Sequence, residues 1–494
     1  MTFSNDTCFD DSPGDTLGRL RAVLPGHCLI TSEEMLRPYE CDGLAVYRET
    51  PLAVALPETE AQAQAVLQLC HELGVPVVPR GAGTGLSGGA LPHSQGVVLS
   101  LAKMAAILHI DKSAQTAVVQ PGVRNLAISE AAAPYGLYYA PDPSSQIACT
   151  IGGNVAENSG GVHCLKYGLT VHNVLRVRVL LMTGEIVELG SEAPDAPGLD
   201  LLALIIGSEG LLGVVTEVTV KLIPIPECAQ LIMASFDTAN AAGEAVAAII
   251  SAGIIPAGLE MMDKAITAAV EPFVNAGYDL EAAAILLAES DGSPAEVETE
   301  IARMEEVLRR SGARAIQISR NEQQRLLFWA GRKAAFPAVG RISPDYYCMD
   351  GTIPRKHLGE MLTAISRMES KYGLGCANVF HAGDGNLHPL IMFDANVPGE
   401  LSKAEQFGAE ILELSVSLGG SITGEHGIGA EKINQMCIQY SADELENFRS
   451  IKRAFDPAGL LNPGKAIPTL HRCAEYGAMH IHNGQVPFPE LPRF

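Results

Sequence analysis

The stretch VPVVPRGAGTGLSGGALP, from Val75 to Pro92, decides which fold the chain adopts. Within it, Gly83-Thr-Gly-Leu-Ser-Gly88 has the spacing of the G-x-G-x-x-G dinucleotide fingerprint, which has physical meaning only when the last glycine opens a helix. Here the next residues lead into the strand-like run Gly96–Leu101, and the helical pattern lies before the loop, at 60–73. The sequence therefore argues against a Rossmann fold, and the lack of a Gly-Lys-Ser/Thr ending argues against a P-loop.

Five glycines lie between Gly81 and Gly89, so this loop can adopt positive φ repeatedly and turn its N–H groups toward an anion. A second block rich in glycine and small residues, PDPSSQIACTIGGNVAENSGG, runs from Pro141 to Gly161, and a third, GSEGLLG, from Gly207 to Gly213. Such loops in one domain indicate a ligand that approaches the main chain at several places. A large phosphate-bearing cofactor fits that description.

The composition is that of a globular enzyme with several domains. A chain of 494 residues, 47% of them apolar, can form about two to four domains with buried cores. The net charge of −23 opposes binding to nucleic acid or to an anionic membrane, because phosphate contacts need clustered Lys and Arg. We therefore expect small-molecule and protein partners and no nucleic acid.

Eleven cysteines are scattered along the chain, without a C-x-x-C pair or the close spacing of a zinc or iron–sulfur site. Reduced thiols are expected. The N-terminal stretch is acidic and polar and lacks the basic and apolar regions of a signal peptide. No run of about 18 apolar residues could span a bilayer. We expect a cytoplasmic protein that reaches a membrane only through partner subunits.

Short β-branched strands recur in the first half of the chain, and the predicted strands are 52–56, 75–78, 97–101, 116–120, 174–181 and 214–222. After Pro224-Ile-Pro226 the pattern changes to alanine-rich helical periods at 239–251 and 294–311, with strands such as 282–287 between them. The predicted order is an N-terminal helical segment at 1–50, a first domain at 51–226, a separate α+β domain at 227–440, a return at 441–466 that includes a helix at 442–454, and a peripheral tail at 467–494.

The ordered set of motifs resembles a known family. The motifs are Pro79–Thr84 with Gly88-Gly89, Pro141–Ser145, Ile151–Asn154, Gly207–Gly210 and Leu461–Lys465. Over most of its length the chain is similar to the FAD-linked oxidases of the vanillyl-alcohol-oxidase type, and most similar to the flavin subunits of bacterial glycolate oxidase. The resemblance implies an α+β fold, in which a two-part FAD-binding domain of the p-cresol methylhydroxylase type precedes an α+β cap domain with an antiparallel sheet.

The same resemblance implies that the loop from Arg80 to Gly89 cradles the FAD pyrophosphate between two strands. The residues implied to line the cofactor are Arg80, Gly81, Ala82, Gly83, Thr84, Gly85, Gly88, Pro141, Asp142, Ser145, Gly152, Gly153, Asn158, Ser159, Gly161, Glu209, Gly213, Val215 and Asn462. Many relatives that bind flavin covalently carry a histidine in or just after the first loop, whereas this loop has none before His93. Non-covalent FAD is therefore expected.

Two histidines flank an Asp-Gly dipeptide, a strong hairpin signal, in the segment Val379–Phe393. Counting outward from a two-residue turn at Asp384-Gly385, His381 faces His388. Directly opposed Cβ atoms lie about 4.5–5.5 Å apart, so two imidazoles on one face can share a metal ion. A pair of half-exposed strand histidines is the alternative.

The glycine-rich loop Gly419–Gly427 offers a third ligand, Glu425. Two histidines and one glutamate make a zinc-type site with an open position for substrate. The matching positions bind a divalent metal in the resembling dehydrogenases. His381, His388 and Glu425 are therefore the predicted ligands, with zinc as the expected ion.

Two further residues are predicted to act on substrate. His426 is not needed by the metal, and a neutral imidazole suits removal of a hydroxyl proton; a hydrogen-bonded loop histidine is the alternative. Because adjacent residues of an extended loop point to different sides, Glu425 is expected to face the metal and His426 the substrate. Arg332 matches the carboxylate-binding arginine of the 2-hydroxy-acid members of the family; a solvated helix arginine is the alternative.

Departures from the family pattern bear on the substrate. Where the D-2-hydroxyglutarate enzymes place a lysine for the distal carboxylate this chain has Cys348, and Pro389-Leu390 replaces a polar side chain. We therefore expect FAD-dependent oxidation of a short 2-hydroxy acid, glycolate or D-lactate, to the 2-oxo acid, with hydride transfer to flavin N5. The alternatives are a D-lactate or D-2-hydroxyglutarate dehydrogenase acting alone, a metal hydrolase, and a non-catalytic FAD-bearing subunit.

Reduced flavin must be reoxidised, and the chain has no cluster-binding cysteine spacing. The resemblance implies an iron–sulfur partner subunit and a second flavin-type subunit, as in the glycolate oxidase complex. These partners are expected to pass electrons toward the membrane.

Overall fold

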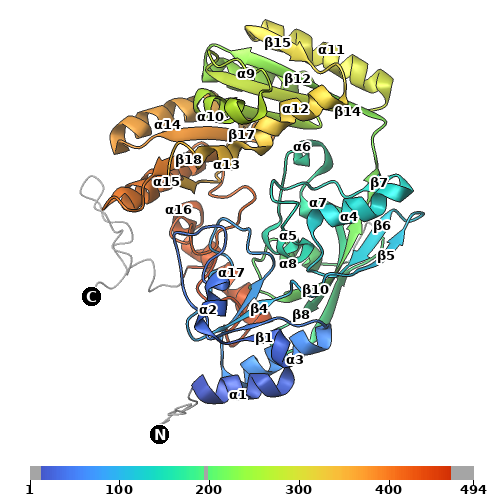
Figure 1. Ribbon diagram of the computed structural model, residues 1–494, viewed down its shortest axis with the longest axis vertical. Helices are drawn as coiled ribbons and strands as arrows, with labels where there is room; N and C mark the ends of the chain where they lie inside the picture. Colours follow the sequence, from blue (N-terminus) through green and yellow to red (C-terminus); the bar gives the residue numbers. More distant parts are fainter. Residues whose placement is uncertain (1–12, 194–197, 469–494) are drawn as a thin grey trace.

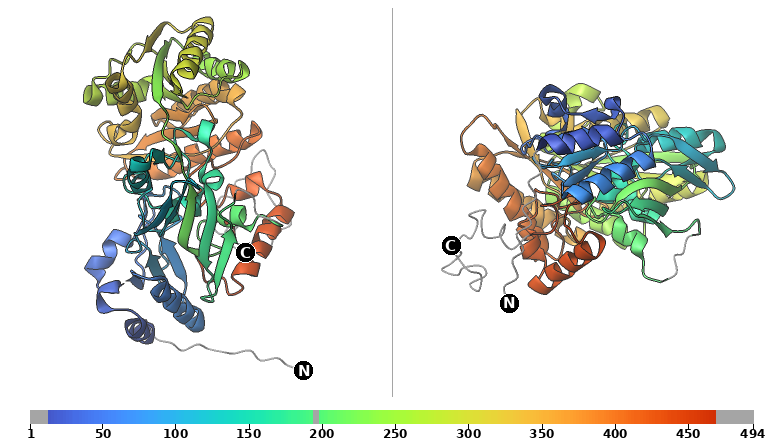
Figure 2. Two further views of the ribbon diagram at one scale, coloured as in Figure 1. Left: turned by 90° about the vertical axis from the view of Figure 1, so that its right-hand side faces the viewer. Right: turned by 90° about the horizontal axis from the view of Figure 1, so that it is seen from below.

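The computed structural model describes residues 13–193 and 198–468, which form two bodies that lie one above the other in Figure 1. The lower body, the N-terminal domain, contains β1 to β11 and α1 to α8. The upper body, the cap domain, contains β12 to β18 and α9 to α15, and α17 returns beside the lower body (Figure 2). Mixed helices and antiparallel sheets in two domains confirm the predicted α+β fold.

The first sheet of the N-terminal domain has the order β1-β2-β4-β3. β2 (Ala53–Ala55) and β3 (Val77–Arg80) both pair in parallel with β4 (Val97–Ser100), because α3 (Glu60–Leu73) crosses between β2 and β3. No helix lies between β3 and β4, as the sequence predicted.

The N-terminal segment, expected to be helical, also contributes a strand, β1 (Leu29–Ile30), which pairs with β2. The helix α3 begins at the N-cap Thr59, whose hydroxyl accepts the amide of Gln62, and ends at Gly74 in the left-handed region. The helices before α3 are α1 (Pro13–Val23) and α2 (Glu33–Leu36), with 3₁₀ turns at Gly26–Cys28 and Arg37–Tyr39.

The second sheet of this domain is antiparallel and has the order β5-β6-β10-β8-β9. Part of the second glycine-rich block is not a loop but the helix α5 (Ile151–Glu157), because Ile151 and Val155 pack into the buried cluster of this sheet. The other elements are β5 (Ile107–Asp111), β6 (Thr116–Val119), β7 (Leu137–Tyr138), β8 (Val174–Leu180), β9 (Ile186–Gly190), β10 (Val214–Lys221), β11 (Ile223–Pro224), α4 (Asn125–Ala132), α6 (Cys164–Tyr167), α7 (Thr170–Asn173), α8 (Leu201–Ile205) and a 3₁₀ turn at Ala133–Tyr135.

The cap domain is built on one seven-stranded sheet with the order β15-β12-β14-β13-β17-β18-β16, and every pair in it is antiparallel, as expected. Its strands are β12 (Cys228–Phe236), β13 (Gly258–Asp263), β14 (Ala284–Gly292), β15 (Ala315–Ile318), β16 (Asp345–Cys348), β17 (Cys376–His381) and β18 (Asn386–Phe393). Its helices are α9 (Ala239–Ser251), α10 (Lys264–Val274), α11 (Pro294–Arg310), α12 (Glu322–Lys333), α13 (Ala335–Val339), α14 (Leu358–Tyr372) and α15 (Glu400–Ser417), with a 3₁₀ turn at Arg355–His357; the short helix α16 (Met436–Gln439) follows in the chain.

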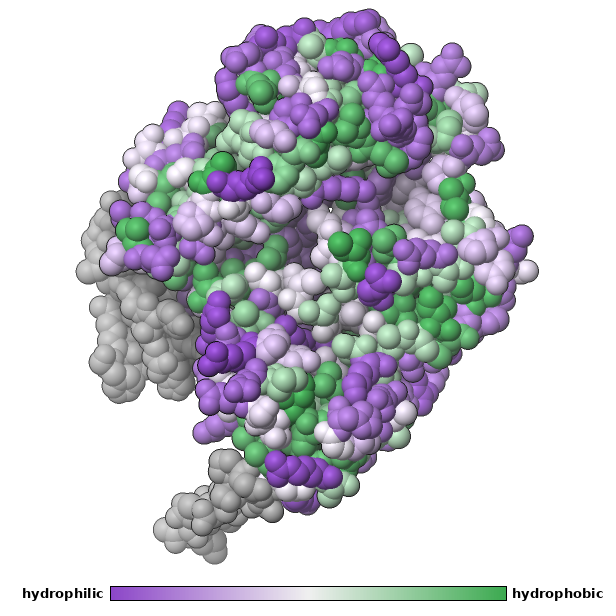
Figure 3. Space-filling view, viewed as in Figure 1, coloured by the Kyte–Doolittle hydropathy of each residue, from purple (hydrophilic) through white to green (hydrophobic). Residues whose placement is uncertain are grey.

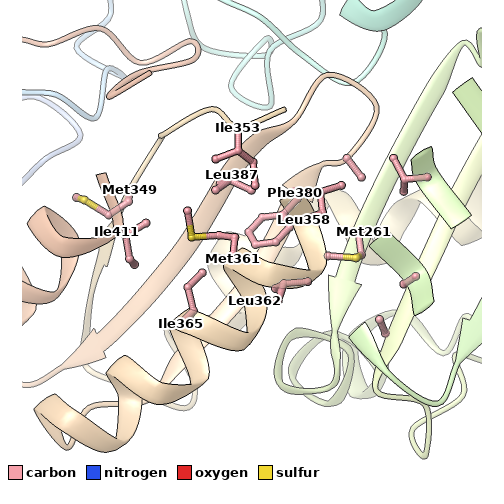
Figure 4. Packing of buried hydrophobic residues seen from close by; sticks show 14 of the residues in the cluster. Met261, Met349, Ile353, Leu358, Met361, Leu362, Ile365, Phe380, Leu387 and Ile411 are labelled. Carbon is pink, nitrogen blue, oxygen red and sulfur yellow. The ribbon is translucent and has the colours of Figure 1, made fainter. Parts of the chain in front are cut away.

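The two faces of the cap sheet bury different clusters, because strand residues alternate in direction. On β14, Leu286 packs in a cluster with α9, α11, α14 and α15, whereas its neighbour Leu287 packs with α10, α12 and α13. Figure 4 shows the first cluster, in which Met361 of α14 lies beside Phe380 and Leu387 of the sheet. The second face carries the candidate site.

The C-terminal return joins the two domains. α17 (Ala442–Phe455) packs Ile451 and Phe455 against the core of the N-terminal domain, and Leu461 forms a parallel bridge with Val77 at the start of β3. Most of the tail predicted to be peripheral, residues 469–494, lies outside the described residues.

The described part of the chain holds nine cysteines, and no disulfide joins any two of them. None of the helices within 13–193 and 198–468 combines the length and the apolar character that crossing a membrane requires.

Candidate functional site

A cavity of about 370 Å³ lies where the two domains meet. The N-terminal domain lines it with residues of all three glycine-rich segments. The cap domain contributes Phe336 and Pro337 of α13, and the cap-side residues His388, Glu425 and His426 complete the wall. Figure 3 shows the surface hollowed between the two bodies. The predicted cofactor loops and the predicted chemical residues therefore share one cavity.

Most residues predicted to bind the cofactor line this cavity: Arg80, Gly81, Ala82, Gly83, Thr84, Gly85, Ser145, Gly152, Gly153, Ser159, Glu209, Gly213 and Val215. Gly88, Pro141, Asp142, Asn158, Gly161 and Asn462 are not among its lining residues. Two of these residues make hydrogen bonds that support the cavity wall from outside. Asp142 accepts the backbone amide of His163, and the Asn462 amide donates to the carbonyls of Gly89 and Glu209.

The first glycine-rich loop exposes backbone atoms to the cavity. A Cβ on Gly85 would find only Asp42 Oδ2 within 4 Å, at 3.9 Å, so this position faces open space. Gly83 has φ +72°, and a Cβ there would collide with the guanidinium of Arg80, which donates to the Cys41 carbonyl at 2.7 Å. Backbone amides without intervening side chains suit a pyrophosphate, so the cavity fits the expected FAD.

His381 and His388 of the cap sheet and Glu425 of the loop after α15 place one potential ligand atom each within 4.8 Å of one another. His381 Nε2 lies 3.2 Å and His388 Nε2 lies 3.1 Å from the same oxygen, Glu425 Oε1. The second contact is not aligned as a hydrogen bond, and neither ring nitrogen of the buried His388 has a hydrogen-bond partner among the described residues. Two imidazoles and one carboxylate, with the His388 ring nitrogens unsatisfied, form a ligand set that fits a divalent ion such as zinc.

The predicted register of the histidine hairpin is wrong. The turn contains four residues, 382–385, so that His381 faces Asn386, and His388 faces Val379. Gly385 adopts φ +82° and its amide donates to the His381 carbonyl, which closes the longer turn. The shift is by two residues, so both imidazoles stay on one face as diagonal neighbours, with ring centroids 5.0 Å apart.

Without a metal ion the same residues form an ion-pair network. Burial disfavours the charged form of His381, but Glu260 and Glu425 outweigh burial and raise the pKa of His381 well above its ordinary value. Burial alone would raise the pKa of Glu425, but His381 and His388 hold it well below its usual range. A proton on His381 and a divalent cation are thus alternative ways to neutralise Glu425.

Glu260 on β13 orients His381 from behind. Its Oε1 lies 2.7 Å from His381 Nδ1, and its Oε2 accepts a 2.7 Å hydrogen bond from Nε of Arg332. A carboxylate on Nδ1 selects the tautomer that presents Nε2 to a metal. Arg332 is buried and does not line the cavity, but its Nη2 has no partner in the described part of the chain. A role for Arg332 in binding a substrate carboxylate stays a prediction.

His426 and Glu425 both contact His388. The His426 ring stacks on the His388 ring, with centroids 4.8 Å apart and planes 18° apart, and its Nε2 is 3.9 Å from Glu425 Oε1. The expectation that the two side chains point to opposite sides is therefore wrong, because residues 424–426 form a bend and not an extended strand. Burial lowers the pKa of His426 to about 4, which leaves a neutral imidazole at pH 7.

Three residues of the site were not predicted from the sequence. Glu260 lies between apolar residues in the strand GLEMMD, a signal that could have identified it, since a buried carboxylate needs a partner. Phe336 lines the cavity and packs edge-on to His388, with ring centroids 6.3 Å apart. Asp350 forms a second possible ligand set with His388 and His426, and no sequence pattern marks it.

Two sequence-family profiles match the chain. The first, described as an FAD binding domain, covers residues 51–190. The second, described as the C-terminal domain of FAD linked oxidases, covers residues 225–466.

The chain is similar to named proteins over most of its length. It is 61% identical to the glycolate oxidase subunit GlcD of Escherichia coli strain K12, an alignment that covers 96% of this chain and 95% of the relative. It is 40% identical to GlcD of Bacillus subtilis strain 168, over 86% and 91% of the two chains. It is 32% identical to a D-lactate dehydrogenase of Anaerostipes hadrus, over 91% and 97%.

Solved structures of low sequence identity share the fold. The structure of p-cresol methylhydroxylase with substrate bound superposes with a TM-score of 0.76 at 18% identity, over 93% of this chain and 97% of that one. The structure of 4-ethylphenol oxidase from Gulosibacter chungangensis superposes with a TM-score of 0.77 at 18% identity, over 92% and 96%.

Proposed function

Because the chain belongs to the family of FAD-linked oxidases and is an FAD-dependent oxidoreductase of 2-hydroxy acids, we propose that it oxidises glycolate to glyoxylate, with D-lactate as the next candidate. The observation that carries the proposal is that one cavity contains both the glycine-rich loops and the chemical side chains. It runs from the glycine-rich loops, which suit FAD, to His388, Glu425 and His426, which suit the hydroxyl of a 2-hydroxy acid. A metal hydrolase would leave the glycine-rich part of the cavity unused.

The protein residues have separate tasks in this reaction. FAD, when bound, supplies the acceptor for the hydride that leaves the substrate carbon. His426 lines the cavity, and its Nδ1 is a buried nitrogen without a partner among the described residues, so it is available to take the hydroxyl proton. Arg332 is proposed to bind the substrate carboxylate through its unpartnered Nη2.

His381, His388 and Glu425 are proposed to hold a divalent ion, with zinc as the first candidate. FAD is the other cofactor, and it is proposed to bind non-covalently. The ion would supply positive charge beside the substrate carboxylate and hydroxyl, which favours loss of the hydroxyl proton. The unsatisfied ring nitrogens of His388 and the Glu260 contact behind His381 support this assignment.

A short substrate with one carboxylate is proposed because part of the cavity wall is apolar. Phe336 and Pro337 line the cavity next to His388, and an aromatic ring leaves a second carboxylate without a polar partner there. Cys348 and Leu390, on which the expectation from the sequence rested, pair across β16 and β18 and do not line the cavity. Lys333 does line it, and this cation makes D-2-hydroxyglutarate the third candidate, after glycolate and D-lactate.

Electron transfer to partner subunits is proposed on the resemblance to glycolate oxidase subunits. The partners would be an iron–sulfur subunit and a second flavin-type subunit. The chain itself would then reach a membrane only through them.

The test is anaerobic reduction of the purified holoprotein. Glycolate, D-lactate and D-2-hydroxyglutarate are added separately, and bleaching of the flavin absorption is followed by stopped flow. We expect glycolate or D-lactate to give the higher kcat/KM. Faster reduction by D-2-hydroxyglutarate would make that diacid the better substrate assignment, and no bleaching by any of the three would favour a non-catalytic FAD-bearing subunit.

A further inference from the structure

The loop 423–429 carries both Glu425 and His426 but has no regular secondary structure. Its geometry is held by a carboxylate of the cap domain, Asp350, which follows β16. Asp350 accepts hydrogen bonds from three consecutive backbone amides, those of Gly424 at 3.1 Å, Glu425 at 3.1 Å and His426 at 2.8 Å. The two residues expected to do chemistry are therefore fixed through their main chain.

Two side chains complete the environment of this carboxylate. The Thr423 hydroxyl donates to Asp350 Oδ2 at 2.5 Å, and the ammonium of Lys432 lies 3.1 Å from the same oxygen. Lys432 also donates to the Gly427 carbonyl at 2.9 Å, so it holds the far end of the bend. Asp350 and Lys432 are both fully buried.

The N-terminal domain holds the continuation of the same loop. The buried carboxylate of Glu209 accepts the amides of Ile428 at 2.7 Å and Gly429 at 2.6 Å. The loop is thus bound by carboxylates from both domains, immediately before and after Gly427. Asp350 holds the half that contains the chemical side chains.

We propose that Asp350 is a positioning residue for the reaction, which places His426 and Glu425 by binding the amides of residues 424–426. This inference rests on the proposed function. A displacement of about 1 Å in a reacting group can cost about 10²-fold in rate, so loss of this carboxylate slows flavin reduction more than it weakens substrate binding.

Ligation of a metal by Asp350 is the competing role. Asp350 Oδ1 lies 3.7 Å from His388 Nε2, within the second possible ligand set. However, Oδ2 already receives the amides of Gly424 and His426, the Thr423 hydroxyl and the Lys432 ammonium, and Oδ1 receives the amide of Glu425. The buried ammonium of Lys432 beside this carboxylate opposes a further cation there. Positioning is therefore the better assignment.

The test compares Asp350→Asn with Asp263→Asn in the holoprotein. Asn keeps the size of the side chain but turns an NH₂ group toward donors. Asp263 is a matched control, because it also accepts backbone amides in the cap domain, those of Ile266 and Asn378, away from this loop. Hydrogen exchange of peptides that cover 423–429 is measured first, since it does not depend on activity.

We expect exchange in this loop to become at least about tenfold faster in Asp350→Asn and to stay unchanged in Asp263→Asn. We expect the limiting rate of flavin reduction by glycolate to fall about 10²-fold in Asp350→Asn, with the flavin and metal contents retained. In a His426→Ala background the same substitution should cost less than it does in the unmutated protein, because one of the two groups that it positions is absent.

Unchanged exchange in Asp350→Asn would overturn the inference, whatever the metal content of the variant, and so would a fully additive effect with His426→Ala. If Asp350→Asn does not fold, Thr423→Val removes one donor from the same carboxylate, and unchanged exchange and rate in that variant would be decisive against the proposal. Absence of bleaching in the unmutated protein would instead count against the proposed function, while the exchange result would still decide whether Asp350 holds the loop.

Discussion

At the scale of single residues, two glycines with nearly the same backbone conformation have different surroundings. Gly83 has φ +72° and Gly136 has φ +73°. A Cβ on Gly83 would collide with Arg80 beside the cavity, whereas a Cβ on Gly136 would have no heavy atom within 4 Å. Substitutions at these two glycines therefore distinguish the destabilisation caused by a left-handed backbone from the effect of a side chain added at the cavity wall.

We expect Gly83→Ala and Gly136→Ala each to lose about 1–2 kcal/mol of unfolding free energy, because alanine is strained at positive φ. Only Gly83→Ala should also lose FAD, since it displaces the Arg80 guanidinium at the wall of the cavity. Denaturant unfolding and the ratio of flavin to protein after gel filtration measure the two effects. Equal flavin retention in both variants would contradict the assignment of this loop to the cofactor.

The adjacent residues Glu425 and His426 are predicted to have separable roles. Glu425→Gln should weaken metal binding, and excess metal should restore part of the activity. His426→Ala should keep metal and FAD but slow flavin reduction by about 10²–10⁴-fold, the usual contribution of a general base. Metal analysis and stopped-flow reduction distinguish them.

The loss in His426→Ala should shrink as the pH rises, because hydroxide can take the proton in place of the imidazole. An equal loss at all pH values, or loss of the metal from His426→Ala, would show that His426 is not the base.

At the scale of elements, the end of β14 joins the cap domain to the helix α6 of the N-terminal domain. His163, at the start of α6, lies 2.8 Å from Asp142 and 3.2 Å from Glu289 of β14. Lys166 donates to Asp291 Oδ1 at 2.5 Å. Arg325 of α12 also faces Glu289, at 2.7 Å. This contact ties the wall of the cavity to the cap sheet.

Burial disfavours the charged form of His163, but Asp142 and Glu289 outweigh burial and raise its pKa well above the ordinary value. Because the pKa of His163 is higher in the folded than in the unfolded protein, its contact contributes fully to stability below the unfolded pKa of about 6.5. This contribution is lost as the pH rises through the folded-state pKa. We expect His163→Gln to cost about 1.5–3 kcal/mol at pH 6, the range for hydrogen bonds to charged groups, and less at pH 9. Thermal unfolding at both pH values measures this.

The control is His71→Gln on α3, where the imidazole is exposed. A pH-independent difference between His163→Gln and the unmutated protein would mean that the charged form of His163 does not contribute.

At the scale of the whole molecule, both domains line the cavity, so a ligand that fills it bridges them. We expect removal of FAD to lower the Tm, because a ligand at 1,000 times its Kd stabilises the folded state by about 4.1 kcal/mol. FAD should restore the Tm, and FMN should restore less of it, since FMN lacks the pyrophosphate expected at the first glycine-rich loop. Scanning calorimetry of the apoprotein with each flavin checks this, and equal recovery with FMN would contradict the placement of the pyrophosphate.

Much of the fold and part of the site follow from local sequence pattern. The helices at 60–73 and 239–251 lie where the sequence predicts them, because caps such as Thr59 and Thr238 mark their starts. The absence of a helix after the first glycine-rich loop already separated this fold from a Rossmann fold. His381 and His388 share a face even though their register was wrong, because a shift of two residues preserves the direction of every side chain.

By itself, the sequence determined many of the elements, the glycine-rich segments and the residues with the chemistry of metal ligands and bases. Only the tertiary structure decided that Glu260 stands behind His381 and that Asp350 holds the amides of 424–426. The sheet order places β13 beside β17, and the loop after α15 folds back on the residue that follows β16. Local patterns encode which face of a strand is buried, but the pairing of strands distant in the chain depends on packing of the whole sheet, so the partners of a buried charge appear only in the folded protein.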